Sequence, residues 1–217
     1  MTESQPQTLQ FNIRRGLLSK HTRQLILTKK FIRYEGKDPH SKSFTEVQAE
    51  DITAFRYGIR WLQGYAFNIG REYQVEIQYG NKQVLKICFL SLYGIHRKEY
   101  HELYAQILDG FWNFYFVPRI PKLLKRFTDG EVIELCNTPV SQDGIIISSD
   151  LLTGPKSYVI PMEQAEVRTY THYFVLCSKE DPGKINKRYS FLDDWNALLL
   201  MGLLLTILEG KHVEGHS

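Results

Sequence analysis

Two parts of the chain show the same order of hydrophobic patterns. In each, several segments alternate apolar and polar residues, and one stretch follows whose apolar residues recur every three or four positions. Alternation places one face of a β-strand against a core, whereas three-four spacing marks one face of a helix. The helices are expected over about 96–114 and 191–209. The repeated order predicts two successive β-rich domains, each closed by a C-terminal helix.

The first domain is expected to contain seven strands, over 10–18, 24–28, 30–35, 43–48, 55–61, 73–79 and 85–89. Residues 80–82, Gly-Asn-Lys, predict a three-residue hairpin loop between the last two strands. That loop length sets Glu76 opposite Lys86 as an opposite-charge cross-strand pair.

The second domain is expected to repeat this order with strands over 131–135, 144–149, 157–161, 166–171, 173–178 and 187–191, and one short strand near Leu151. Ser190 is the expected N-cap of the final helix, with an acidic first turn at Asp193. The two helices share an Ile-Leu-acid-Gly sequence, at which both are expected to end.

The domain boundary is expected near residue 118, where Pro118 and Pro121 should stop the first helix and a short helical turn should follow. The expected divisions are a mobile polar arm over 1–8, a first domain over 9–118 and a second over 119–217.

Composition excludes several classes of protein. The chain has 217 residues, 43% apolar and 24% charged, which is ordinary for a globular protein and excludes wholesale disorder. Its longest apolar run, 197–208, is shorter than the roughly 20 residues that cross a bilayer. Three widely spaced cysteines argue against a disulfide scaffold, and the N-terminus does not resemble a secretory signal. We therefore expect a cytoplasmic protein, with peripheral membrane association as an alternative.

Two short segments of the first domain carry recognisable motifs, RQLILTKKFI over 23–32 and AEDITAF over 49–55. The first resembles the turn between the second and third strands of the bacterial pleckstrin-homology (PH)-like families, and the second resembles the beginning of their fifth strand. Residues 141–146 and 160–167 are similar to the same two places more loosely. The resemblance implies a mainly β fold of two seven-stranded, partly open β-barrels, each closed by a C-terminal α-helix. Many PH-like domains bind no lipid and serve as docking platforms for peptides or proteins, so the resemblance alone does not decide the function.

A basic region precedes residue 43, with nine Lys and Arg against three acidic residues. In PH domains that bind phosphoinositides, the loop between the first two strands holds the phosphates. The resemblance places such a loop at about 16–23, and an acidic membrane surface becomes a candidate partner. The alternative is a solvated face. The candidate anionic-ligand residues are Arg14, Arg15, Lys20, Arg23, Lys29 and Lys30.

No catalytic motif occurs in the sequence. The sequence contains none of four common motifs: Gly-x-Ser-x-Gly, a Gly-rich phosphate loop, His-Glu-x-x-His and Cys-x-x-Cys. We therefore expect no enzyme, no cofactor and no metal. A net charge of +3 is too small to favour nucleic-acid binding.

Aromatic residues are concentrated, since residues 55–116 hold 16 of the 28. Residues 61–67 read as a loop with four large apolar side chains, where turns are usually polar. Burial against the second domain would explain them; docking of a protein or peptide partner is the sharper interpretation. The candidate partner surface is Arg56, Arg60, Trp61, Tyr65 and Phe67.

The final helix is apolar on all sides. Only one face can meet its own domain, and it lacks the polar, basic face of a membrane-surface helix. We therefore expect the helix over 191–209 to bury its other face against the first domain or in a homodimer.

Overall fold

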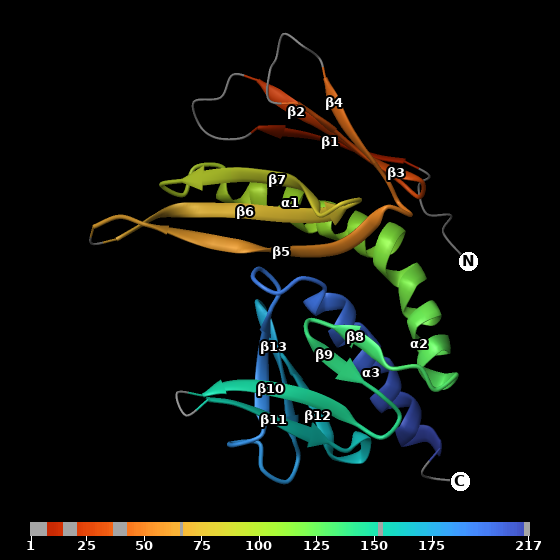
Figure 1. The fold of residues 1–217 in the computed structure, drawn as a ribbon. Coiled ribbons are helices and arrows are strands. Elements are labelled where there is room, and N and C mark those ends of the chain that lie inside the picture. The colour runs from red at the N-terminus through yellow and green to blue at the C-terminus, as the bar shows by residue number, and fades with distance from the viewer. Residues whose placement is uncertain (1–7, 15–20, 37–42, 66, 152–153, 215–217) are drawn as a thin grey trace. The chain divides into compact units, whose positions relative to one another are not determined.

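The protein is described by a computed structural model that covers residues 8–14, 21–36, 43–65, 67–151 and 154–214. The chain divides into two compact units, Met1–Pro118 and Arg119–Ser217. The fold is mainly β, with two antiparallel sheets in each unit (Figure 1).

Unit 1 contains a four-stranded and a three-stranded sheet, both in sequential order. The first sheet consists of β1 (Thr8–Arg14), β2 (Thr22–Thr28), β3 (Phe31–Glu35) and β4 (Phe44–Gln48). The second consists of β5 (Ile52–Gln63), β6 (Asn68–Tyr79) and β7 (Gln83–Leu92).

The first strand begins earlier than the sequence pattern predicts. β1 starts at Thr8, a residue expected in the N-terminal arm, because Thr8 and Leu9 already pair with Thr28 and Leu27 of β2. The expected extension of this strand over 15–18 lies outside the described residues, as do residues 1–7.

The β6–β7 hairpin confirms the predicted register. Glu76 lies opposite Lys86, and Tyr79 opposite Gln83 at the turn. On its other side Glu76 lies opposite Arg56 of β5, so one acidic residue sits between two basic ones across three strands.

Helix α1 (Arg97–Phe111) packs its aromatic face on the second sheet. The Tyr104 ring lies 5.2 Å from that of Tyr73, and the Tyr100 ring 5.5 Å from that of Phe89. Near its end the helix also approaches the first sheet. A Cβ added at Gly110 would lie 2.8 Å from Leu9 Cδ1, so glycine permits this close packing.

The prolines do not stop this helix, contrary to the prediction. A π-helix over Trp112–Phe116, a 3₁₀ turn over Val117–Arg119 and α2 (Ile120–Thr128) follow without a break. Pro121 lies in the first turn of α2, where a missing N–H costs no intrahelical bond. The π segment, with its i to i+5 bonding, lets residues five apart share a face. Phe111 and Phe116 accordingly both contact Phe55, with ring centroids 6.0 and 4.2 Å away.

Unit 2 repeats the division into four and three strands. The first sheet holds β8 (Ile133–Leu135), β9 (Thr138–Val140), β10 (Ile145–Leu151) and β11 (Gly154–Ile160). After a 3₁₀ turn (Met162–Gln164), the second holds β12 (Ala165–Thr169), β13 (Tyr173–Ser178) and β14 (Asn186–Ser190).

The sequence pattern missed β9. Cys136 and Asn137 both adopt left-handed φ, of 54° and 52°, and make a two-residue turn that pairs Leu135 with Thr138. A cysteine at positive φ gives no readable turn signal. The strand expected near Leu151 is the end of β10, not a separate strand.

The final helix, α3 (Ala197–Glu214), begins six residues later than predicted. Ser190 does make cap-like bonds, because its Oγ accepts from the Asp193 amide at 3.2 Å. Asp194 also accepts from the Ser190 amide at 2.7 Å. These bonds close a turn that ends β14 instead of starting the helix. Gly110 and Gly210, the predicted helix ends, both lie inside helical segments.

Part of the outer face of α3 is covered inside unit 2. Helix α2 is amphipathic, with Ile120, Leu123, Leu124 and Phe127 at three-four spacing, and it packs against α3. Each apolar side chain of α3 from Leu198 to Leu208 is buried or half-buried.

The strand pairings do not close a barrel. No pairing among the described strands joins the two sheets of either unit, so each unit is a pair of open antiparallel sheets with a helix. Among the described helices, none combines the length and apolar character needed to cross a membrane.

Candidate functional site

The outer end of the β5–β6 hairpin carries a cluster of exposed apolar side chains. Trp61, Tyr65 and Phe67 come from the hairpin, with Phe67 65% exposed and Tyr65 fully exposed. The turn after β7 adds two more exposed apolar side chains, Ile95 and Tyr93, of which Tyr93 lines the same pocket as Trp61. In unit 1 the hairpin extends beyond β7 at this end (Figure 1). We call these five residues the aromatic tip.

Backbone pairing fixes the aromatic tip. The Gly64 amide donates to the Phe67 carbonyl at 2.8 Å and closes the hairpin. The Tyr93 amide donates to the Ile69 carbonyl at 2.8 Å, which ties the turn after β7 to β6. Tyr93 holds a left-handed φ of 52° in this turn.

Trp61 is exposed because β5 extends past the start of α1, the helix that covers the core side of the sheet. Its row in the sheet is Trp61, Arg71 and Ser91, two residues beyond the buried row that contains Tyr73 and Phe89. Helix α1 starts at the buried row, where the Tyr73 hydroxyl lies 3.4 Å from the Arg97 carbonyl. The next row therefore continues the core-facing side of the sheet past the start of α1.

A pocket of about 210 Å³ lies beside this row. Trp61, Ile69, Arg71, Tyr93 and Arg97 line it, and none of its lining residues is acidic. The Arg71 guanidinium lies over the Trp61 ring, 4.0 Å from the centroid, a cation-π contact. The pocket is thus lined by the Trp61 ring with the Arg71 guanidinium stacked on it and by a second arginine, Arg97.

Gly70 allows the strands to approach one another at the floor of this pocket. A Cβ at this position would lie 2.3 Å from the Ser91 carbonyl oxygen, so any other residue would push β6 and β7 apart.

The predicted partner surface is only partly assembled. Trp61, Tyr65 and Phe67 gather at the aromatic tip, whereas Arg56 lies five residues back along β5, about 16 Å at 3.3 Å per residue. Arg60 is opposite Glu72 and, by strand alternation, on the other face of the sheet from Trp61.

Arg56 instead belongs to a charged row in the sheet. Its Nη2 lies 2.7 Å from Glu76 Oε2, and Lys86 Nζ lies 3.2 Å from Glu76 Oε1. Burial would raise the pKa of Glu76, but the hydrogen bonds and charges of Arg56 and Lys86 outweigh burial and lower it. This row stabilises the sheet and leaves Arg56 engaged.

Sequence reasoning missed Arg71, Tyr93 and Arg97. The strand expected over 73–79 begins at Asn68, and only that longer strand sets Arg71 opposite Trp61. The apolar alternation stops at Tyr73, because residues 70–72 are Gly-Arg-Glu, so no pattern marked this extension of the strand.

The four described anionic-ligand candidates lie in two separate groups. Arg14 ends β1 and Arg23 lies near the start of β2, whereas Lys29 and Lys30 lie at the β2–β3 turn. The six residue steps of β2 separate the two groups by about 20 Å. Arg15 and Lys20 lie outside the described residues.

Arg23 is occupied within the sheet. Its Nε donates to the Glu35 carbonyl at 2.8 Å, its Nη2 donates to the same oxygen, and its guanidinium lies over the Tyr34 ring at 4.0 Å. Lys29 and Lys30 are exposed, and the Thr28 Oγ1 accepts from the Lys30 amide at 3.2 Å.

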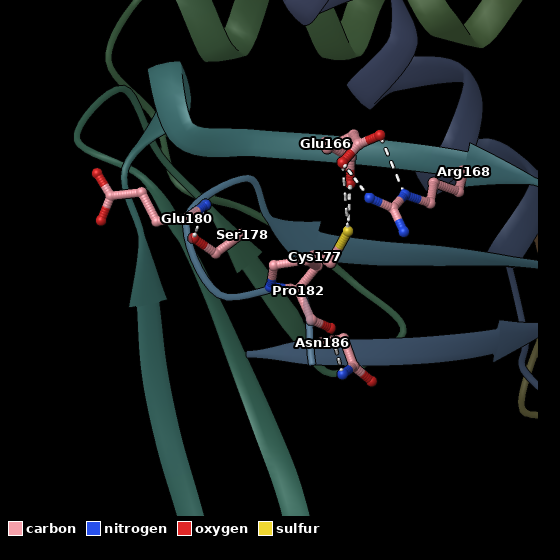
Figure 2. A network of polar contacts seen from close by, with 7 residues as sticks. All are labelled: Glu166, Arg168, Cys177, Ser178, Glu180, Pro182 and Asn186. Atoms are coloured by element: carbon pink, nitrogen blue, oxygen red, sulfur yellow. Dashed lines mark hydrogen bonds and ion pairs between the residues drawn. The ribbon is translucent and has the colours of Figure 1, made fainter. Parts of the chain in front are cut away.

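A polar network in unit 2 resembles no catalytic arrangement (Figure 2). The Cys177 Sγ lies 3.8 Å from Glu166 Oε2, and Arg168 pairs with the same carboxylate at 2.8 Å. Burial raises the pKa of the Cys177 thiol, which opposes formation of a nucleophilic thiolate. Within the described ranges, no group of three or more His, Cys, Asp or Glu could hold a metal ion.

The sequence matches no protein-family model and no curated protein.

Proposed function

We propose that the chain is a non-enzymatic binding module of two PH-like units whose first unit docks a protein or peptide partner at the aromatic tip. The PH-like assignment is supported by the order of four strands, three strands and a helix in each unit. The sequence resemblance implied seven strands and a helix in each unit, and the structure divides the strands of each unit into sheets of four and three.

The observation that carries the docking proposal is the exposure of the aromatic tip. Trp61, Tyr65, Phe67 and Tyr93 lie on a hairpin and turn whose backbones are hydrogen-bonded, so little conformational entropy is lost when they are covered. Trp, Tyr and Arg are the residues that most often dominate binding energy at protein interfaces.

Among the described residues, docking fits the geometry better than phospholipid binding through the basic residues. The described cations divide into two groups, since Arg14 and Arg23 lie about 20 Å from Lys29 and Lys30, and a phosphate group needs several cations around one point. Two donors of Arg23, Nε and Nη2, are already hydrogen-bonded to the Glu35 carbonyl.

The test uses the full chain as bait for a displayed library of random short peptides. A recovered peptide is then labelled, and its affinity is measured for the wild type and for a Trp61→Ser/Phe67→Ser variant. We expect at least a tenfold loss of affinity, since each hot-spot aromatic contributes 2 kcal/mol or more. Tyr170→Ser, which removes an exposed tyrosine from unit 2, is the matched control and should bind as the wild type does.

Recovery of no peptide, together with binding to acidic vesicles that Lys29→Glu/Lys30→Glu abolishes, would overturn the proposal in favour of a lipid surface. Equal affinity for the wild type and the Trp61→Ser/Phe67→Ser variant would move the docking surface elsewhere.

A further inference from the structure

Two arginines at the pocket beside the aromatic tip have no acidic counterpart. Arg71 contacts the Trp61 ring, and Arg97 is the first residue of α1. Within the described residues neither guanidinium forms an ion pair, and no lining residue of the pocket is acidic.

The surrounding sequence does not neutralise them. Between residues 56 and 99 the chain has seven Lys and Arg against three acids, Glu72, Glu76 and Glu99. Glu99 lies in the first turn of α1 and contacts His96 Nδ1 at 2.6 Å. Glu76 is held by Arg56 and Lys86, and Glu72 lies across from Arg60 and accepts a hydrogen bond from Gln74. The start of α1, which carries the positive end of the helix dipole, flanks the same pocket.

The conformation and burial of the Arg71 side chain also favour ion pairing. Its stack on Trp61 limits its rotamers, and its side chain is half-buried, so water screens its charge less than that of an exposed arginine. A planar guanidinium held this way presents two donors in the geometry that a carboxylate accepts.

From these observations we infer that the pocket binds the carboxylate of an Asp or Glu side chain of the partner, with Arg71 and Arg97 as its ligands. The aromatic tip then contacts the apolar side chains of the partner that lie next to this acidic residue. The partner is thus an acidic peptide segment with adjacent apolar side chains. The inference rests on the proposed function and specifies its ligand class. At about 210 Å³ the pocket is smaller than the 300–1,000 Å³ typical of small-molecule sites and suits a single side chain.

The same display experiment provides the test. We expect peptides recovered with the full chain to carry Asp or Glu at one fixed position next to apolar residues. Replacing that residue by Gln or Asn in the peptide should weaken binding about tenfold or more, the range for hydrogen bonds to a charged group. Arg71→Gln/Arg97→Gln in the protein should weaken binding of the acidic peptide similarly and should leave its amide analogue unchanged.

Arg188→Gln is the matched control. Arg188 lies over the Tyr173 ring in unit 2, 4.1 Å from the centroid, so the variant removes the same charge and the same kind of stack from another place. It should bind as the wild type does. Thermal unfolding of each variant shows whether lost binding reflects lost folding. Arg71→Lys keeps the charge but not the planar fork, and it should recover part of the affinity.

The outcomes separate this inference from the proposed function. Peptides that need Trp61 and Phe67 but carry no preferred acid would leave docking intact and overturn the carboxylate site. Acidic peptides that bind the Arg71→Gln/Arg97→Gln variant as tightly as the wild type would overturn it too. Recovery of no peptide, together with vesicle binding that Lys29→Glu/Lys30→Glu abolishes, would overturn both.

Discussion

Glu76 joins the three strands of the β5–β7 sheet, and we predict that Glu76→Gln destabilises unit 1 by about 2 kcal/mol. The residue is 7% exposed and contacts both Arg56 and Lys86. A hydrogen bond to a charged group contributes roughly 1.5–3 kcal/mol. The Arg56 and Lys86 side chains are 30% and 43% exposed, so water recovers part of the loss when the carboxylate is removed.

Thermal unfolding followed by circular dichroism measures this change. For a unit of this size, 2 kcal/mol corresponds to a drop in Tm of roughly 6–10 °C. Glu166→Gln is the control, because the Glu166–Arg168 pair in unit 2 is exposed to solvent and should contribute much less.

The pH dependence provides an independent check on the cause. The pKa of Glu76 is lower in the folded protein than its ordinary value of 4.5, so its contribution is present above pH 4.5. That contribution is lost as the pH falls through the folded pKa. The stability difference between wild type and Glu76→Gln should therefore shrink below pH 4.5. An unchanged Tm at pH 7, or a difference that stays constant on acidification, would refute the reasoning.

Three further predictions concern packing and burial. Gly110→Val should destabilise unit 1 by about 1–3 kcal/mol through overpacking. Gly210→Ala should instead stabilise α3 by up to about 1 kcal/mol, because a Cβ at Gly210 meets open space. Tm measurements on the two variants should therefore shift in opposite directions. Tyr115→Phe should cost about 1 kcal/mol in urea unfolding, since its hydroxyl lies 2.6 Å from the Thr28 carbonyl oxygen. Burial raises the pKa of Tyr57 to about 12, so the folded protein should ionise fewer tyrosines at pH 11 than the urea-unfolded chain, as read by tyrosinate absorbance. The neutral form is stabilised by folding, and this contribution is lost as the pH rises toward 12.

The sequence pattern correctly predicted those elements whose structure is determined by residues close together in the sequence. The β6–β7 hairpin follows from its Gly-Asn-Lys turn and from the charges of Glu76 and Lys86, all within a few residues of one another. The two helices also lie close to where three-four spacing predicts them.

The rest depends on conformations and contacts that no local pattern encodes. The two-residue turn at Cys136 and Asn137 requires left-handed backbone at a cysteine, and the π-helix coincides with long-range packing of Phe111 and Phe116 on Phe55. The candidate site shows the same limit. Its aromatic residues stood out in the sequence, but Arg71 and Arg97 reach them only through strand register and the start of a helix.

The packing of α2 on α3 decides where the second unit can be cut from the first. By strand count, a fragment starting at Glu131 would look complete, since β8 to β14 and α3 all follow it. It would nevertheless lack the helix whose Leu123, Leu124 and Phe127 form an apolar face against α3. The leucine-rich surface left bare would favour self-association. A soluble fragment of unit 2 should therefore begin before Ile120 and keep α2 as its first element.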